Sequence, residues 1–178
     1  MIVTGAVWKF ALDDIDTDQI RRAVYSHLPK EEQGQHCLES LDPTFASRAQ
    51  PGDVIVAGKN FGCGSSRPAH VAILALGIGA VLAESFGRLF FRNSISGGLL
   101  VVPCPGIVEF ASAGDRIELD TVAGLVRNVA SGQTLSFPPL PEFLREMAEL
   151  GGEKPYLKKW LERQRVGPLA PGDASPAA

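Results

Sequence analysis

The chain has 178 residues, of which 45% are hydrophobic and 21% charged, so it can bury one core without disulfides. Its formal net charge of −3 gives no electrostatic reason to bind nucleic acid or an anionic membrane. No window of about 18 residues is free of polar groups, and the N-terminus lacks a basic region followed by an apolar run, so we expect no membrane span, no secretory signal and a cytoplasmic protein.

Short apolar stretches alternate with helical patterns in the first part of the chain. This alternation is typical of parallel strands joined by helices, so we expect an α/β core. The polar stretch after the first strand predicts short helices and loops. The expected strands are residues 3–10, 54–57, 80–83 and 99–102, the expected helices are 67–76 and 86–96, and the polar stretch is 21–50.

The sequence changes character after the last of these strands. Residues 115–136 alternate between apolar and polar side chains around a turn, which predicts antiparallel strands covering the core. Residues 140–150 and 154–164 predict two amphipathic helices, separated by a pair of glycines.

The end of the chain is rich in Pro, Gly, Ala and Ser. Such a composition cannot bury enough apolar area to offset the entropy lost on ordering. We therefore expect one domain over residues 1–166 and a disordered tail over residues 167–178.

The three cysteines, Cys37, Cys63 and Cys104, are odd in number and include no C-x-x-C pair. This spacing is not that of a disulfide framework, a zinc site or an iron–sulfur site. We expect three reduced thiols and no metal ligands in this chain.

The segment NFGCGSSR, residues 60–67, is the most informative in the sequence. Its glycines let a ligand approach the backbone, a following helix start would offer free N–H groups, and Arg67 has a fork of donors shaped for a carboxylate. A plain turn with Ser66 as helix cap explains the pattern equally well. The segment does not match three known motifs. It lacks the third glycine of a dinucleotide fingerprint, the Gly-Lys-Ser/Thr of a P-loop, and the glycine that a nucleophile elbow would have at position 67.

Together with DDIDTDQI at 13–20 and AESFGRLFFRNSISGGLLVV at 83–102, this segment resembles the small subunit of the aconitase superfamily. The isopropylmalate dehydratase (isomerase) small subunits are the most similar members. The resemblance implies a swivelling β/β/α domain with a mixed sheet and flanking helices. It also implies dehydration and rehydration of a small hydroxy di- or tricarboxylic acid.

The resemblance implies roles for matching residues. Ser65 would be the catalytic base, Ser66 and Arg67 would bind substrate carboxylates, and Thr17 and Asp18 would approach the site from the first loop. The [4Fe-4S] cluster would be held by a partner large subunit. Backbone N–H groups at the expected helix start and Arg67 would stabilise the serine alkoxide.

The sequence departs from the family pattern at two places. Pro68 and Ala69 stand where the family has Glu-His, and His70, one residue later, is expected to be a core or surface residue. His27 stands where isopropylmalate-type chains carry a substrate-sensing arginine. Another alkylmalate, a homoaconitase-like acid or a binding-only domain therefore stays open as an alternative.

Four further residues have no settled role at this level. Arg21 and Arg22 lie close enough in sequence to substitute for the missing arginine. Arg88 and Asn93, in the third segment, suit either substrate contact or structural support of the loop.

Overall fold

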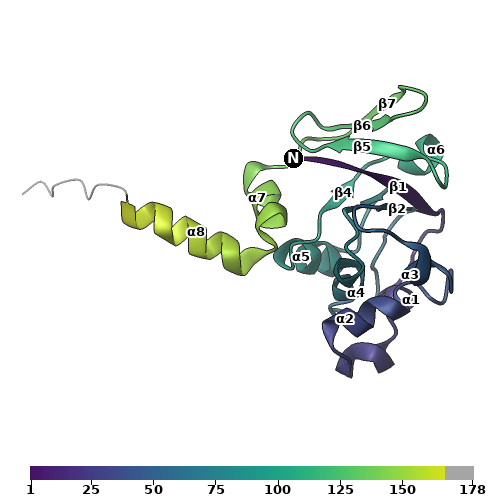
Figure 1. The fold of residues 1–178 in the computed structure, drawn as a ribbon, viewed down its shortest axis with the longest axis horizontal. Coiled ribbons are helices and arrows are strands. Elements are labelled where there is room, and N and C mark those ends of the chain that lie inside the picture. The colour runs from purple at the N-terminus through teal and green to yellow at the C-terminus, as the bar shows by residue number, and fades with distance from the viewer. Residues whose placement is uncertain (167–178) are drawn as a thin grey trace, which may run out of the picture.

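The computed structural model describes residues 1–166, in which seven strands form one mixed sheet of order β4-β3-β2-β1-β5-β6-β7 (Figure 1). The α/β fold class with a mixed sheet and flanking helices is confirmed. The strands are β1 Ile2–Phe10, β2 Val54–Ala57, β3 Ala80–Ala83, β4 Val101–Pro103, β5 Arg116–Asp120, β6 Leu125–Asn128 and β7 Thr134–Ser136.

The central strands β2 and β3 match their expected bounds. Every residue of both is buried, as expected for parallel strands covered on both faces. Strand β2 pairs in parallel with both β1 and β3, and β3 pairs in parallel with β4.

Strand β1 joins the two halves of the sheet. Its first part, Ile2 to Ala6, pairs antiparallel with β5, and its second part, Val7 to Phe10, pairs in parallel with β2. The expected antiparallel strands therefore continue the same sheet. The sheet curls so that Ile117 of β5 packs in one core cluster with Val54 and Val56 of β2.

Helices cover the other face of the parallel strands, where Ile55 and Val81 pack with residues of the early loops and of two longer helices. The polar stretch 21–50 forms short helices, as expected. The helical elements up to β4 are α1 Thr17–Ile20, η1 Ala23–His27, α2 Lys30–Gln33, η2 Gly34–His36, α3 Phe45–Arg48, α4 His70–Ala75 and α5 Arg88–Ser96.

Several expected helix and strand boundaries were wrong by a few residues, and one helix was missed. The helix expected at 67–76 begins only at His70, the helix expected at 86–96 begins at Arg88, and the strand expected at 99–102 is β4. Hydrogen bonds of the preceding loop fix the residues before each helix: Arg67 bonds Ser65, and the Gly87 N–H bonds the carbonyl of Phe61. The missed helix is α6, Ile107–Phe110.

The C-terminal helices are α7, Glu142–Leu150, and α8, Glu153–Val166. Between them Gly151 and Gly152 both have positive φ angles, 79° and 121°, which explains the expected break. Helix α8 extends away from the sheet (Figure 1). The expected tail at 167–178 lies outside the described residues. None of the helices within 1–166 is long and apolar enough to cross a membrane.

Candidate functional site

Two loops that are distant in sequence meet at the ends of β1 and β2. The backbone N–H of Gly62 donates to the carbonyl of Ile15 over 2.7 Å, and the N–H of Thr17 donates to the carbonyl of Cys63 over 3.0 Å. Asp16 and Cys63 form a parallel bridge. The expected approach of the first loop to the glycine loop is therefore present in the fold.

A capping box fixes the first of these loops. The Asp16 carboxylate accepts from the backbone N–H groups of Asp18 and Gln19, each over 2.8 Å, and the Gln19 side chain accepts from the Asp16 N–H over 2.9 Å. This arrangement sets the start of α1, so Thr17 and Asp18 have defined positions although the helix has only four residues.

Glycine is required at one position of the second loop. Gly62 has φ +76°, and a Cβ atom there would lie 2.1 Å from Cγ of Phe90. Gly64 also has a positive φ, +88°, but a Cβ there would meet nothing closer than 3.6 Å. The loop is thus packed against α5 at Gly62 and open beside Ser65.

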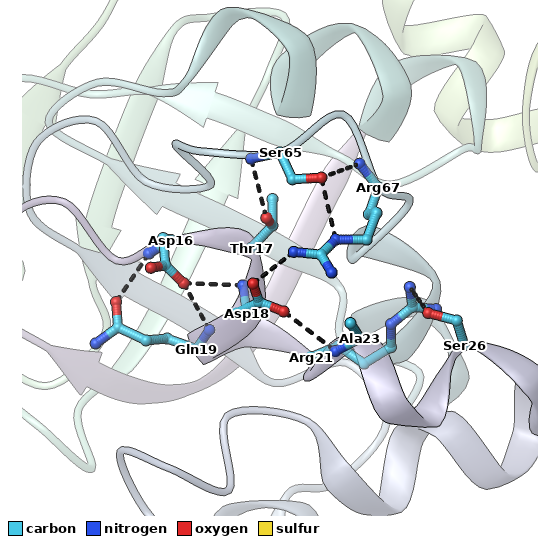
Figure 2. A network of polar contacts seen from close by, with 9 residues as sticks. All are labelled: Asp16, Thr17, Asp18, Gln19, Arg21, Ala23, Ser26, Ser65 and Arg67. Atoms are coloured by element: carbon cyan, nitrogen blue, oxygen red, sulfur yellow. Dashed lines mark hydrogen bonds and ion pairs between the residues drawn. The ribbon is translucent and has the colours of Figure 1, made fainter.

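The half-buried Ser65 is the centre of a polar network (Figure 2). Its backbone N–H donates to Oγ1 of Thr17 over 3.3 Å. Its Oγ accepts two hydrogen bonds from Arg67, one from the backbone N–H over 3.2 Å and one from Nε over 3.0 Å. Two N–H donors thus point at one hydroxyl oxygen.

Arg67 links Ser65 to Asp18. Its Nη2 lies 2.5 Å from Oδ2 of Asp18, while Oδ1 of Asp18 accepts from the backbone N–H of Ala23 over 3.1 Å. The side chains of Arg67 and Asp18 are 38% and 51% exposed, so a ligand can reach both. Within residues 1–166 the Nη1 group of Arg67 has no hydrogen-bond partner and remains available to an anion.

The alternative reading of the loop, with Ser66 as a helix cap, was wrong. Helix α4 begins at His70, its N-cap residue is Ala69, and no side chain caps it. The dipole of this six-residue helix therefore does not act on Ser65, and the donors at Ser65 come from Arg67. The exposed Ser66 offers its carbonyl to Nδ2 of Asn93 over 3.1 Å, which supports the structural reading of Asn93.

The structure does not bring His27 into the Ser65 network. His27 is the last residue of η1 and is exposed, and no hydrogen bond within residues 1–166 joins it to Ser65 or Arg67. Arg21 does not substitute for a solvent-facing arginine, because it is 3% exposed and its guanidinium binds other side chains. Arg22 is exposed at the start of η1.

A hollow of about 240 Å³ opens beside the glycine loop. Arg88, which had no settled role from the sequence, lies on its wall at the start of α5. The hollow is lined by Asn60, Gly62, Cys63, Gly64, Gly87, Arg88 and Leu89.

Cys37, Cys104 and His70 lie apart from this network, whereas Cys63 belongs to the glycine loop. Burial raises the pKa of the Cys37 thiol, and burial and the charge of Glu84 raise that of Cys104 to about 12. Burial, with the positive charges of Arg21 and Lys30, lowers the pKa of His70 to about 4. Within residues 1–166 no group of three or more His, Cys, Asp or Glu side chains is placed to hold a metal ion.

Known proteins are similar to this chain in sequence. The model of the aconitase C-terminal domain family matches residues 3–105. The isopropylmalate/citramalate isomerase small subunit of Methanocaldococcus jannaschii is 46% identical over 160 residues, which cover 89% of this chain and 95% of that protein. The 3-isopropylmalate dehydratase small subunit of Caldicellulosiruptor bescii is 43% identical over 165 residues, or 92% and 99% of the two chains.

A solved structure extends the similarity to three dimensions. The crystal structure of a 3-isopropylmalate dehydratase from M. jannaschii superposes with a TM-score of 0.85 at 38% identity. The match covers 94% of this chain and all of that one. The family match over residues 3–105 includes both loops of the candidate site.

Proposed function

Since the chain belongs to the aconitase C-terminal domain family, and within it to the 3-isopropylmalate dehydratase small subunits, we propose that it is the small subunit of a two-subunit hydro-lyase. The substrate is a substituted malate such as 3-isopropylmalate. Residues 1–166 form the swivel domain that closes over the partner's site. The observation that carries the proposal is the pair of Arg67 hydrogen bonds to the Oγ of Ser65.

In this proposal Ser65 takes a proton from the carbon next to a substrate carboxylate. A serine hydroxyl is too weak an acid to serve as a base unless its alkoxide is stabilised. The backbone N–H and the cationic Nε–H of Arg67 supply that stabilisation, because both already point at the oxygen that would carry the charge. Loss of hydroxide from the neighbouring carbon completes the dehydration, and addition of water in the opposite sense gives the isomer.

Arg67 binds a substrate carboxylate through its outer nitrogens. Its Nε–H is committed to Ser65, and Asp18 holds Nη2, so Nη1 is directed to the ligand. Asp18 fixes the fork, Thr17 holds the backbone of Ser65, and Ser66, exposed beside them, adds a hydroxyl for the same carboxylate.

Activation of the departing hydroxyl is assigned to a [4Fe-4S] cluster held by the large subunit, where iron acts as a Lewis acid. The small-subunit names of the relatives support a partner large subunit, which would hold this cluster. The three free cysteines also suit a reducing compartment such as the cytoplasm.

Citramalate, a methyl-substituted malate, is the second candidate substrate. The M. jannaschii relative is named for both isopropylmalate and citramalate. In this chain His27 replaces the arginine that isopropylmalate-type chains carry, and it stands at the end of the exposed η1 segment. We assign His27 to sensing the alkyl group or the distal carboxylate.

Reconstitution tests the proposal. The chain is combined anaerobically with a large subunit that carries the cluster, and dehydration is followed for isopropylmalate, citramalate and homocitrate. The proposal expects activity with a substituted malate only when both chains are present. Brown colour with stoichiometric iron and sulfide in the lone chain would overturn the proposal that the large subunit holds the cluster. Tight substrate binding without turnover would favour a binding-only domain.

A further inference from the structure

Arg21 is a buried cation at the edge of the candidate site. It follows α1, and only 3% of its surface is exposed. Its Nη2 donates to Oγ of Ser26 over 3.0 Å (Figure 2). Its Nη1 donates to Oε1 of Gln33. These partners are neutral, so Arg21 is held by hydrogen bonds to both.

The same partners hold the η1 segment that ends at His27. Gln33, itself 6% exposed, donates from Nε2 to the carbonyl of Leu28 over 2.7 Å. We call Arg21, Ser26 and Gln33 the Arg21 clamp. It fixes η1 near its end, while Asp18 fixes its beginning through the N–H of Ala23 over 3.1 Å.

Apolar burial contributes little to the position of η1. None of its five residues is buried, and Val24 is 57% exposed. Tyr25 stacks on the ring of His36 with centroids 3.6 Å apart, which is the one aromatic contact of the segment within residues 1–166. Polar contacts therefore decide where the rest of η1 lies.

Burying the guanidinium of Arg21 costs free energy of folding. Burial lowers the pKa of Arg21, the positive charge of Arg67 lowers it further, and the weaker effect of the Asp18 charge opposes them. Its Nε is buried with no partner within residues 1–166. Burying a charge beside neutral partners usually costs stability. We therefore expect Arg21 to have a role other than stabilising the fold, and its contacts indicate that this role is to position η1.

We propose that Arg21 is a positioning residue that fixes η1, and through it His27, at the edge of the substrate site, and so sets which substituted malate is preferred. The inference rests on the proposed function, because it assigns substrate choice to η1. Asp18 connects the two sets of contacts, since one of its oxygens binds Arg67 and the other binds Ala23.

The first test needs no activity. Amide hydrogen exchange is measured in the whole lone chain for wild type, Arg21→Met and Arg21→Lys, with Arg127→Met, at an exposed arginine of β6, as control. Loss of hydrogen bonds from a charged group predicts exchange about tenfold faster at the amides of Ala23 and Leu28 in both Arg21 variants. Unchanged exchange there would overturn the clamp.

Ser26→Ala covers the case in which an Arg21 variant does not fold. It removes one exposed hydroxyl and one clamp contact, and it should accelerate the same amides by about threefold, the effect of one weaker bond. The amides of Gly62 and Thr17, which belong to the other loop contact, should be unchanged. Equal acceleration at both places would show general destabilisation and contradict a local clamp.

The second test uses the reconstituted two-subunit enzyme. Arg21→Met should reduce the ratio of kcat/KM between preferred and poorer malates by about fivefold or more, a shift of roughly 1 kcal/mol. Arg127→Met should leave the ratio unchanged. An equal fall for all malates with Arg21→Met would overturn the specificity role. If the wild-type enzyme dehydrates none of the malates, the proposed function is refuted. The hydrogen-exchange measurement would still show whether the Arg21 clamp fixes η1.

Discussion

The Nε–H of Arg67 donates to the Oγ of Ser65 over 3.0 Å, and the backbone N–H of the same arginine donates to that oxygen over 3.2 Å. One residue thus contributes a charged and a neutral donor to a single hydroxyl. This pairing provides stabilisation for negative charge without the helix dipole that the sequence suggested, because α4 begins only at His70.

Arg67→Lys is expected to weaken substrate binding and also to slow turnover. A lysine has one point charge, which cannot contact Ser65, Asp18 and a carboxylate in the geometry of the fork. Loss of the charged hydrogen bonds to the carboxylate and to Ser65 predicts a kcat/KM about 10–100-fold lower, with a higher KM and a lower kcat. Steady-state kinetics of the reconstituted enzyme checks this, with Arg92→Lys on the exposed side of α5 as control. A fall in kcat alone would contradict it.

Gly62→Ala is expected to destabilise the fold far more than Gly64→Ala. Both glycines have positive φ, which costs about 1–2 kcal/mol for another residue. Only at position 62 would the new Cβ also collide with Phe90, at 2.1 Å. Denaturant unfolding should give a loss of about 3 kcal/mol or more for Gly62→Ala and about 1–2 kcal/mol for Gly64→Ala. Equal losses would contradict the packing at Gly62.

Stability should fall as pH drops below neutrality, in part through His70. Burial, then the charges of Arg21 and Lys30, lowers its pKa from 6.5 to about 4. The unfolded state therefore takes up the proton first, and the free energy of unfolding decreases as pH falls from 6.5 towards 4. The difference corresponds to about 3 kcal/mol at most. Above pH 6.5 His70 is neutral in both states and does not make the free energy of unfolding depend on pH.

His70→Leu tests this origin of the acid sensitivity. Nδ1 of His70 is buried without a partner within residues 1–166, so the variant loses no hydrogen bond there. Denaturant unfolding is measured between about pH 4 and about pH 7, a range that spans the two pKa values. The free energy of unfolding should change less steeply with pH for His70→Leu than for wild type. An identical slope in His70→Leu would assign the effect to other groups.

His27→Arg should change the order of preference among substituted malates. An arginine at the end of η1 offers a bidentate donor to a distal carboxylate, which a histidine does not. The measurement is kcat/KM over a panel that includes isopropylmalate and citramalate. If the order is the same in both enzymes, His27 takes no part in specificity.

The parallel core could be predicted from the sequence because its signals are local. Strands β2 and β3 are four-residue apolar runs ended by polar or glycine residues, and both were placed to the residue. The start of α4 could not be predicted, since Pro68 is compatible with a first helical turn. Hydrogen bonds between Arg67 and Ser65 decide against that turn.

The candidate site was predicted in part. Thr17 and Asp18 were expected near Ser65 and Arg67 from the family resemblance, and the fold brings all four together. The burial of Arg21 had no sequence signal. It depends on Gln33, twelve residues later and in another helix, and on the path of η1 between them.

The central claim is that Ser65 is the proton-transfer base, and kcat of the reconstituted Ser65→Ala enzyme tests it most directly. Its hydroxyl is half-buried and water can replace it, so the free energy of unfolding should change by about 1 kcal/mol or less. Loss of a general base predicts a kcat about 10²–10⁴-fold lower with a much smaller change in KM. If the stable Ser65→Ala enzyme keeps more than about a tenth of the wild-type kcat, Ser65 is not the base and the loop only binds the carboxylate.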